Sequence, residues 1–173
     1  MPIYTIRGKT PKLGQRAWLA PSAYVTGDVE LGDDVSFWFN TVARGDVHWI
    51  RIGDGTNIQD GAVLHVSDGT YPLSIGRGVI VGHGAIVHGC TLEDDVLVGM
   101  GAQVLDGAVV ESGAQIAAGA VVPPGMRVPA GHLAMGIPAK VKRPLTEEEK
   151  SANSATKDRY ISLKEEYRSA LGS

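Results

Sequence analysis

The chain has 173 residues, enough for one domain with a sizeable core, and a net charge of -3 from 16 basic and 19 acidic residues. This balance does not suit a nucleic-acid-binding protein or a polybasic membrane-binding segment, so we expect neither partner. The chain has no apolar run of about 18 residues, and Met1–Tyr4 does not begin a signal peptide, so no membrane span or secretion is expected. A single cysteine, Cys90, excludes disulfides within one chain and favours a cytoplasmic location.

Aliphatic residues, here called anchors, recur every six positions through most of the chain. An α-helix with 3.6 residues per turn cannot keep a six-residue stripe, whereas a short strand followed by a turn can. Three such sides form one triangular coil, and stacked coils place their strands about 4.8 Å apart, as in a parallel sheet. The anchors are Leu13, Leu19, Val25, Leu31, Phe37, Ala43, Ile52, Ile58, Leu64, Ile75, Val81, Val87, Leu92, Val98, Val104, Val110, Ile116, Val122 and Val128.

These nineteen anchors, at three per coil, predict about six coils. A β-sandwich is disfavoured because its strands do not keep one period over so long a stretch. Residues 13–140 resemble the left-handed parallel β-helix superfamily, and the left hand is implied by that resemblance alone. We therefore expect a mainly β protein with a β-helix domain over 1–144.

Residues 145–173 are expected to form a C-terminal helix that packs on the prism or on a neighbouring subunit. Thr146 and Glu149 form a capping-box pattern at its start, which predicts a helix from about 147 to 170. Tyr160 and Tyr167 fall on one face of this helix.

The six-residue register breaks at three places, namely Ala43–Ile52, Leu64–Ile75 and Val87–Leu92. When each step is counted as one side of the prism, His65 and His88 follow anchors on the same face in adjacent coils. Arg44 belongs to the same column. His83 lies on another face, where the count places it beside Asp60.

Two imidazoles on one face cannot complete a tetrahedral zinc site, which needs a third protein ligand and a position for water. A cyclic trimer would bring the face of His83 against the face of His65 and His88 of the next chain. The histidine pattern therefore predicts a metal site shared between subunits.

Five short motifs surround these histidines: Arg44-Gly45-Asp46, Asn57-Ile58-Gln59-Asp60, His65, Gly82-His83 and His88-Gly89-Cys90. As an ordered set they resemble the gamma-class carbonic anhydrases and their short bacterial homologues. The resemblance implies a homotrimer in which His65 and His88 come from one chain and His83 from its neighbour. It implies Zn(II), with Fe(II) or Co(II) as alternatives, because neutral imidazoles bind all three metals.

The same resemblance implies hydration of carbon dioxide to bicarbonate by hydroxide that the metal supplies near neutral pH, an effect for which carbonic anhydrase is itself the standard example. Gln59 would orient water or substrate, and Arg44 and Asp46 would form a charged pair near the interface. Asp60 and Asn57 would support the ligand His83 from behind. Tyr160 would either reach the pocket or pack the helix.

Two departures concern proton transfer. Val47 stands where the best-studied members carry a glutamate, and the loop that carries their shuttle glutamate is short here. Asp68, the nearest acidic residue of that loop, and His48 are the candidate proton shuttles.

Other functions remain open on this pattern. A metal-binding scaffold without fast turnover would need only the histidines. Hexapeptide acyltransferases share the repeat, and a metal-dependent thioesterase would use the same metal centre. Cys90 is expected to be a small core residue, with a redox-sensitive thiol as the alternative.

Overall fold

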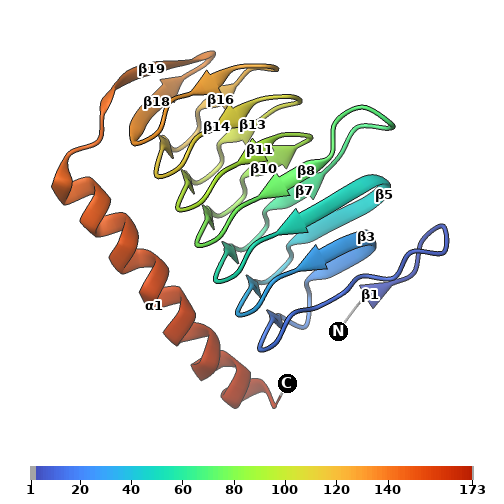
Figure 1. Cartoon of the computed structure of the whole chain (residues 1–173). Helices are drawn as coiled ribbons and strands as arrows, with labels where there is room; N and C mark the ends of the chain where they lie inside the picture. The colour runs from blue at the N-terminus through green and yellow to red at the C-terminus, as the bar shows by residue number, and fades with distance from the viewer. Residues whose placement is uncertain (1–2, 173) are drawn as a thin grey trace.

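The computed structural model describes residues 3–172. The expected limits of the two domains at residues 1 and 173 therefore lie outside the described residues. Short parallel strands stack into a left-handed β-helix with the shape of a triangular prism, which confirms the predicted fold class. The coils stack from the N-terminal end up to β18 (His132–Gly136) and β19 (Ala139–Pro144), and the helix α1 (Glu147–Leu171) then runs back along the prism (Figure 1).

The first face, here called the histidine face, contains seven strands within residues 3–172, two of them by their first halves only. They are β1 (Ile3–Tyr4), β3 (Tyr24–Leu31), β5 (Val42–Ile52), β7 (Val63–His65), β10 (Ile86–His88), β13 (Gln103–Val104) and β16 (Val121–Val122). The second face contains the later halves of β3 and β5, followed by β8 (Leu73–Ile75), β11 (Thr91–Leu92), β14 (Val109–Val110) and β17 (Arg127–Val128).

The third face, here called the helix face, is an eight-stranded sheet in the described part of the chain. Its strands are β2 (Trp18–Leu19), β4 (Ser36–Phe37), β6 (Asn57–Ile58), β9 (Ile80–Val81), β12 (Leu97–Val98), β15 (Gln115–Ile116), β18 (His132–Gly136) and β19 (Ala139–Pro144). β19 is antiparallel, so seven parallel strands remain, one per coil.

The prism therefore has about seven coils over residues 3–172 rather than the expected six. The difference comes from the two ends, where strands lie outside the anchor series. β1 pairs with β3 below the first full coil, and β18 extends the helix face above the last anchor. The anchor series began at Leu13, after β1, and stopped at Val128, although Ala134 of β18 follows six residues later and pairs with the anchor Ile116.

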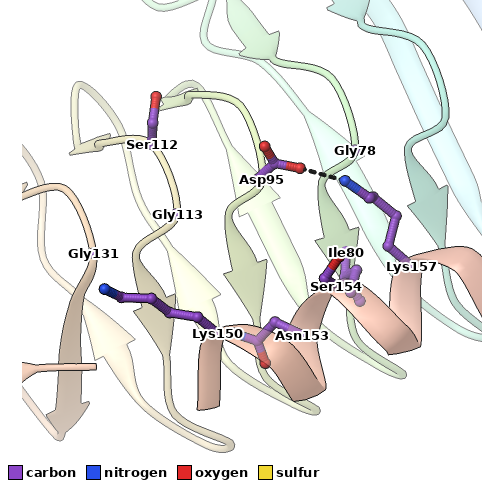
Figure 2. Close-up of a pocket in the computed structure, with 10 residues that line it drawn as sticks. All are labelled: Gly78, Ile80, Asp95, Ser112, Gly113, Gly131, Lys150, Asn153, Ser154 and Lys157. Atoms are coloured by element: carbon purple, nitrogen blue, oxygen red, sulfur yellow. Dashed lines mark hydrogen bonds and ion pairs between the residues drawn. The ribbon is translucent and has the colours of Figure 1, made fainter. Parts of the chain in front are cut away.

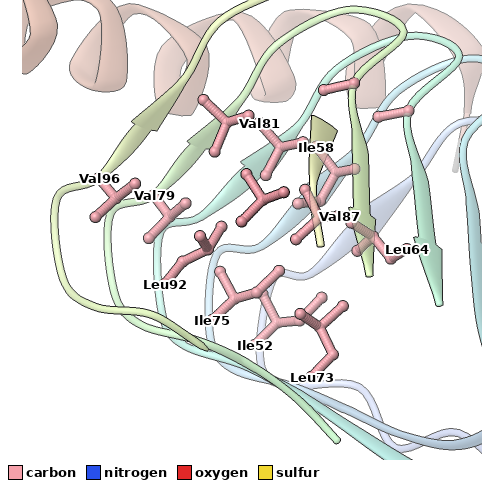
Figure 3. Close-up of a cluster of buried hydrophobic side chains, with 14 of the residues drawn as sticks. Ile52, Ile58, Leu64, Leu73, Ile75, Val79, Val81, Val87, Leu92 and Val96 are labelled. Carbon is pink, nitrogen blue, oxygen red and sulfur yellow. The ribbon is translucent and has the colours of Figure 1, made fainter. Parts of the chain in front are cut away.

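Anchors from successive coils stack in ladders inside the prism, as Figure 3 shows for Ile58 beside Val81 and Leu64 beside Val87. These side chains are fully buried, which removes their apolar surface from water and holds one coil on the next. Leu13 is an exception, because its side chain is 37% exposed. It was expected to point inward, but it lies in the end coil, where only one side has a neighbouring coil.

Helix α1 begins as predicted. The Thr146 side chain accepts a hydrogen bond from the Glu149 amide, and the Glu149 carboxylate accepts one from the Thr146 amide. Farther along, Tyr160 and Tyr167 pack edge-on against Trp38 of the helix face, with ring centroids 5.3 and 5.1 Å away.

The last part of α1 is held to the prism by Lys164, whose side chain is fully buried. Its Nζ donates to Asp34 Oδ1 at 2.7 Å and to the Arg16 carbonyl at 3.1 Å. Arg16 also pairs with Asp34, and this hydrogen bond and the one from Lys164 lower the pKa of the Asp34 carboxyl to about 2, against the opposing effect of burial.

Candidate metal centre

His65 and His88 end adjacent strands on the histidine face and are direct partners in the ladder between β7 and β10. The register insert between Leu64 and Ile75 forms a loop, so the residue beside His65 in the next coil is His88 and not His83. The rings approach closely, with Nδ1 of His65 3.0 Å from Nε2 of His88. Arg44 lies one coil below, in the column expected for it, because Ala43 pairs with Leu64.

Each of the two rings is held from outside by a carboxylate. Asp46 Oδ1 lies 3.1 Å from Nε2 of His65, and Asp106 Oδ1 lies 2.5 Å from Nδ1 of His88. Arg44 pairs with Asp46 at 2.5 Å, as the family resemblance implied. The four side chains Asp46, His65, His88 and Asp106 thus form one continuous chain of contacts.

Asp106 was missed by the sequence analysis. It lies one coil above His88 because Val87 pairs with Val104, and Asp106 follows that anchor by two. The same counting that joined His65 to His88 could have found it, had carboxylates as well as histidines been placed on the prism.

The two carboxylates determine which ring nitrogen of His65 and of His88 carries the proton. A carboxylate accepts hydrogen bonds, so Nε2 of His65 and Nδ1 of His88 carry the protons. The inner nitrogens then face each other with two lone pairs. Two nitrogen ligands at about 2.0–2.1 Å from a tetrahedral Zn(II) would lie about 3.3 Å apart, so the observed separation of 3.0 Å is close to that of two ligands of one divalent metal.

The charge states agree with this arrangement. Burial lowers the pKa of His65, which favours the neutral imidazole that metals bind. Burial acts to raise the pKa of Asp46, but hydrogen bonds from Arg44 and His65 outweigh it and the pKa is lowered. The pKa of Asp106 is lowered in the same way, by hydrogen bonds from Ser67 and His88 against the effect of burial.

His83 follows β9 at the corner of the helix face, and its side chain is 43% exposed. Asp60 Oδ2 lies 2.9 Å from Nδ1 of His83, so the expected neighbours are together. Tyr160 both packs on Trp38 and places its hydroxyl 3.4 Å from Nε2 of His83. Burial and the nearby Asp60 raise the pKa of this tyrosine.

Gln59 and Asn57 lie on β6 or directly after it, and both are almost completely buried. The backbone N–H of Gln59 donates a hydrogen bond to the Val81 carbonyl, which places Gln59 in the coil next to that of His83. Within residues 3–172, both side-chain polar atoms of Asn57 are buried without a hydrogen-bond partner. No described contact joins Asn57 to His83, so its expected support of that residue is not seen.

The two candidate proton shuttles lie apart from the histidine pair. Asp68 is exposed in the loop after β7, and its described contact is a hydrogen bond from Thr70 to its carbonyl. His48 Nδ1 accepts from the Trp49 amide at 2.9 Å. Neither side chain has a described contact with His65 or His88.

Cys90 is buried in the core, as expected, and burial raises the pKa of its thiol. Within residues 3–172 of a single chain, no three His, Cys, Asp or Glu side chains gather into a metal-binding group. In the described part of the chain, no helix is both long enough and apolar enough to cross a membrane.

A cavity of about 360 Å³ lies elsewhere, between α1 and the corners of the prism (Figure 2). Lys150, Asn153 and Lys157 line it from the helix, and Asp95 lines it from a corner. Lys157 is paired with Asp95 at 2.7 Å and Asn153 with Gln115 at 3.1 Å. Lys157 and Asn153 thereby fasten the helix to the prism, and Lys150 pairs with Glu147 of its own helix, so the polar groups of this cavity are already engaged.

Comparison with known proteins agrees with the fold and the motifs. Residues 89–124 match the family model described as bacterial transferase hexapeptide (six repeats). A solved structure of a candidate acetyltransferase from Bacillus cereus is 43% identical with a TM-score of 0.94, over 97% of both chains. The chain is therefore a hexapeptide-repeat protein.

Two curated relatives define the family more closely. A carbonic anhydrase of Geobacillus kaustophilus is 51% identical over 85% of this chain and 80% of its own length. The mitochondrial gamma carbonic anhydrase 2 of Arabidopsis thaliana is 46% identical over 93% of this chain and 60% of its own length. This chain belongs to the gamma carbonic anhydrase family.

Proposed function

We propose that this protein is a metal-dependent carbonic anhydrase that hydrates carbon dioxide to bicarbonate. One observation carries the proposal, namely the facing ring nitrogens of His65 and His88, 3.0 Å apart, with their outer nitrogens held by Asp46 and Asp106. A pair of neutral imidazoles with converging lone pairs is suited to a divalent cation. The name of the Geobacillus relative supports the same activity.

The third ligand in this proposal is His83 of the partner subunit in a homotrimer. Asp60 holds Nδ1 of His83, so Nε2 is the nitrogen that would bind a metal, in place of its 3.4 Å contact with the Tyr160 hydroxyl. The side chain is exposed enough to meet a second chain, and it follows a strand of a different face from the histidine pair. Three equivalent sites would form in a closed trimer.

A divalent metal held by His65, His88 and the partner's His83 would make hydroxide available near neutral pH, the property for which zinc carbonic anhydrases are known. Zn(II) is the metal we expect, and Fe(II) or Co(II) would accept the same imidazoles. Gln59, buried in the coil beside His83, would orient water or carbon dioxide through its amide. Arg44 would hold Asp46, and Asp46 would hold the ring of His65.

Few side chains are placed to carry a proton from the metal site to solvent. His48 and Asp68 are the proposed carriers, but neither has a described contact with the histidine pair. We therefore expect hydration to be limited by proton transfer and to accelerate when small buffers such as imidazole are added. A rate that is independent of buffer concentration would mean that the chain has an efficient carrier of its own.

Subunit mixing tests the shared site directly. His65→Ala removes a ligand from one side of each interface, and His83→Ala removes the ligand from the other side. Every mixed trimer then contains one interface with all three histidines. Random assembly of equal amounts would restore about a quarter of the wild-type metal content and hydration rate.

Each pure variant is the matched control and should bind almost no metal. If the mixture binds no more metal than the pure variants, the shared site is wrong. If the wild type binds one metal per chain but stopped-flow measurements show no hydration, the protein is a metal-binding scaffold and the proposed activity fails.

A further inference from the structure

The loop between β7 and β8 reaches over the histidine face through Ser67. The Ser67 hydroxyl donates to Asp106 Oδ2 at 2.6 Å, while Asp106 Oδ1 accepts from Nδ1 of His88 at 2.5 Å. A short bridge between Ser67 and Tyr71 closes the base of this loop. The two oxygens of Asp106 are thus used separately, one by the loop and one by the histidine.

The backbone around Asp106 makes room for this contact. Gly89, which follows His88, has a φ of +50° and passes so close that a Cβ there would lie 2.4 Å from Asp106 Oδ1. The Tyr71 side chain covers the same place, with its ring 3.0 Å from the Cβ position of Gly107. Glycines at 89 and 107 therefore let the carboxylate and the loop approach the histidine together.

Asp106 differs from other aspartates at the corners of the prism. Asp33, Asp54 and Asp94 each accept a hydrogen bond from a backbone amide of the coil below, which fastens one coil to the next. The hydrogen bonds described for Asp106 go to the side chains of Ser67 and His88. Asp106 therefore holds two side chains, whereas the other three aspartates bind the backbone of the neighbouring coil.

We propose that Asp106, held by Ser67, is a positioning residue that keeps His88 in the Nδ1–H form and aims its Nε2 at Nδ1 of His65. A carboxylate that fixes the tautomer and orientation of an imidazole strengthens it as a ligand. The consequence for metal binding rests on the proposed function, whereas the tautomer itself is a property of the metal-free chain.

The first test uses the metal-free protein. In the wild type, imidazole ¹⁵N NMR should show His88 mainly as the Nδ1–H tautomer. In Asp106→Ala the proton is expected to move to Nε2, where it can be donated to His65. Asp106→Asn should keep most of the Nδ1–H form, because its amide oxygen can still accept. Asp94→Ala is the matched control, and it should leave the His88 signals unchanged.

The second test measures Co(II) affinity and the visible absorption of the bound Co(II). Asp106→Ala should weaken binding about 10- to 100-fold and alter the absorption bands, with partial recovery in Asp106→Asn. Ser67→Ala should have a smaller effect, because Asp106 keeps its contact with His88. Asp94→Ala should bind as the wild type does.

Folded Asp106→Ala that keeps the wild-type tautomer and affinity would overturn the inference while leaving the metal site intact. If the wild type binds no Co(II) at all, the proposed function fails, and the NMR result still decides the role of Asp106.

Discussion

The prism is built from two kinds of coil. Between Ala43 and Leu92 the six-residue step is broken three times, and this stretch contains the three proposed metal ligands. From Leu92 to Val128 every step is six, and the outward residues of β13 and β15 are glutamines. Both stretches bury their anchors almost completely, so the core does not depend on the breaks. The irregular steps serve the surface, where they bring His65 beside His88.

The boundary between these stretches is where they cooperate. Asp106 comes from a regular coil, yet it holds His88 of an irregular one. A regular lattice gives each corner residue a rigid position, and rigid support is what an orienting carboxylate needs. The irregular coils supply the ligands, and the first regular coil supplies one of their supports.

Matched core substitutions would separate the two roles most strongly. Ile58 and Ile116 are both fully buried on the helix face, in an irregular and a regular coil respectively. Replacing either by alanine should lower the free energy of unfolding by about 2–5 kcal/mol, measured by urea titration. Only Ile58→Ala should also weaken metal binding, because Gln59 and Asp60 follow it directly. Equal metal loss in Ile116→Ala would contradict the division between the coils.

A pair of glycine substitutions gives a smaller effect. Gly89 and Gly119 both have positive φ, so the backbone strain of alanine at either position should by itself cost about 1–2 kcal/mol of stability. A Cβ at Gly119 meets no atom within 4 Å, whereas one at Gly89 would displace Asp106. We therefore expect weaker metal affinity in Gly89→Ala alone. Thermal unfolding and metal titration of the two variants measure the difference, and unchanged affinity in Gly89→Ala would count against it.

The ion pair between Lys164 and Asp34, which holds the end of α1 to the prism, should make stability depend on pH. The pKa of Asp34 is about 2 in the folded protein and near 3.8 in an unfolded chain, so its ion pairs stabilise above pH 4 and are lost as pH falls toward 2. Asp34→Asn should cost about 1–2 kcal/mol at pH 7, because partial exposure screens the pair. Stability measured from pH 5 to pH 2 should therefore fall less steeply in the variant. A slope equal to that of the wild type would mean that other carboxyls cause the acid response.

The smallest effect is expected at the start of the helix. Thr146→Ala removes the side-chain cap and should lower stability by about 1 kcal/mol. This end of α1 lies over the regular coils, while Tyr160 near His83 is three to four turns away. Helicity by circular dichroism should fall slightly and metal affinity should not change. A loss of affinity would show that the whole helix, and not only Tyr160, supports His83.

The six-residue period predicted the prism and the column of His65 and His88, because one period determines both burial and height in a solenoid. Side-chain partners were predicted where the coil count brought them together, as for Asp60 and His83, or where the family resemblance implied them, as for Arg44 and Asp46. Ser67 could not be placed, since it lies in a loop where the period is interrupted. Lys164 was unpredictable for a different reason, because burying a lysine requires Asp34 and Arg16 from the far end of the chain.

The antiparallel strand β19 has a consequence for the growth of the stack. A parallel prism ends in coils whose backbone groups could pair with another prism, and such open edges promote fibres. β19 folds back on β18 and occupies that edge on the helix face, with Lys140, Lys142 and Arg143 along it. β16 and β17, which end the other two faces, have two residues each. β19 therefore caps the prism at this end and leaves only short edges on which another coil could stack.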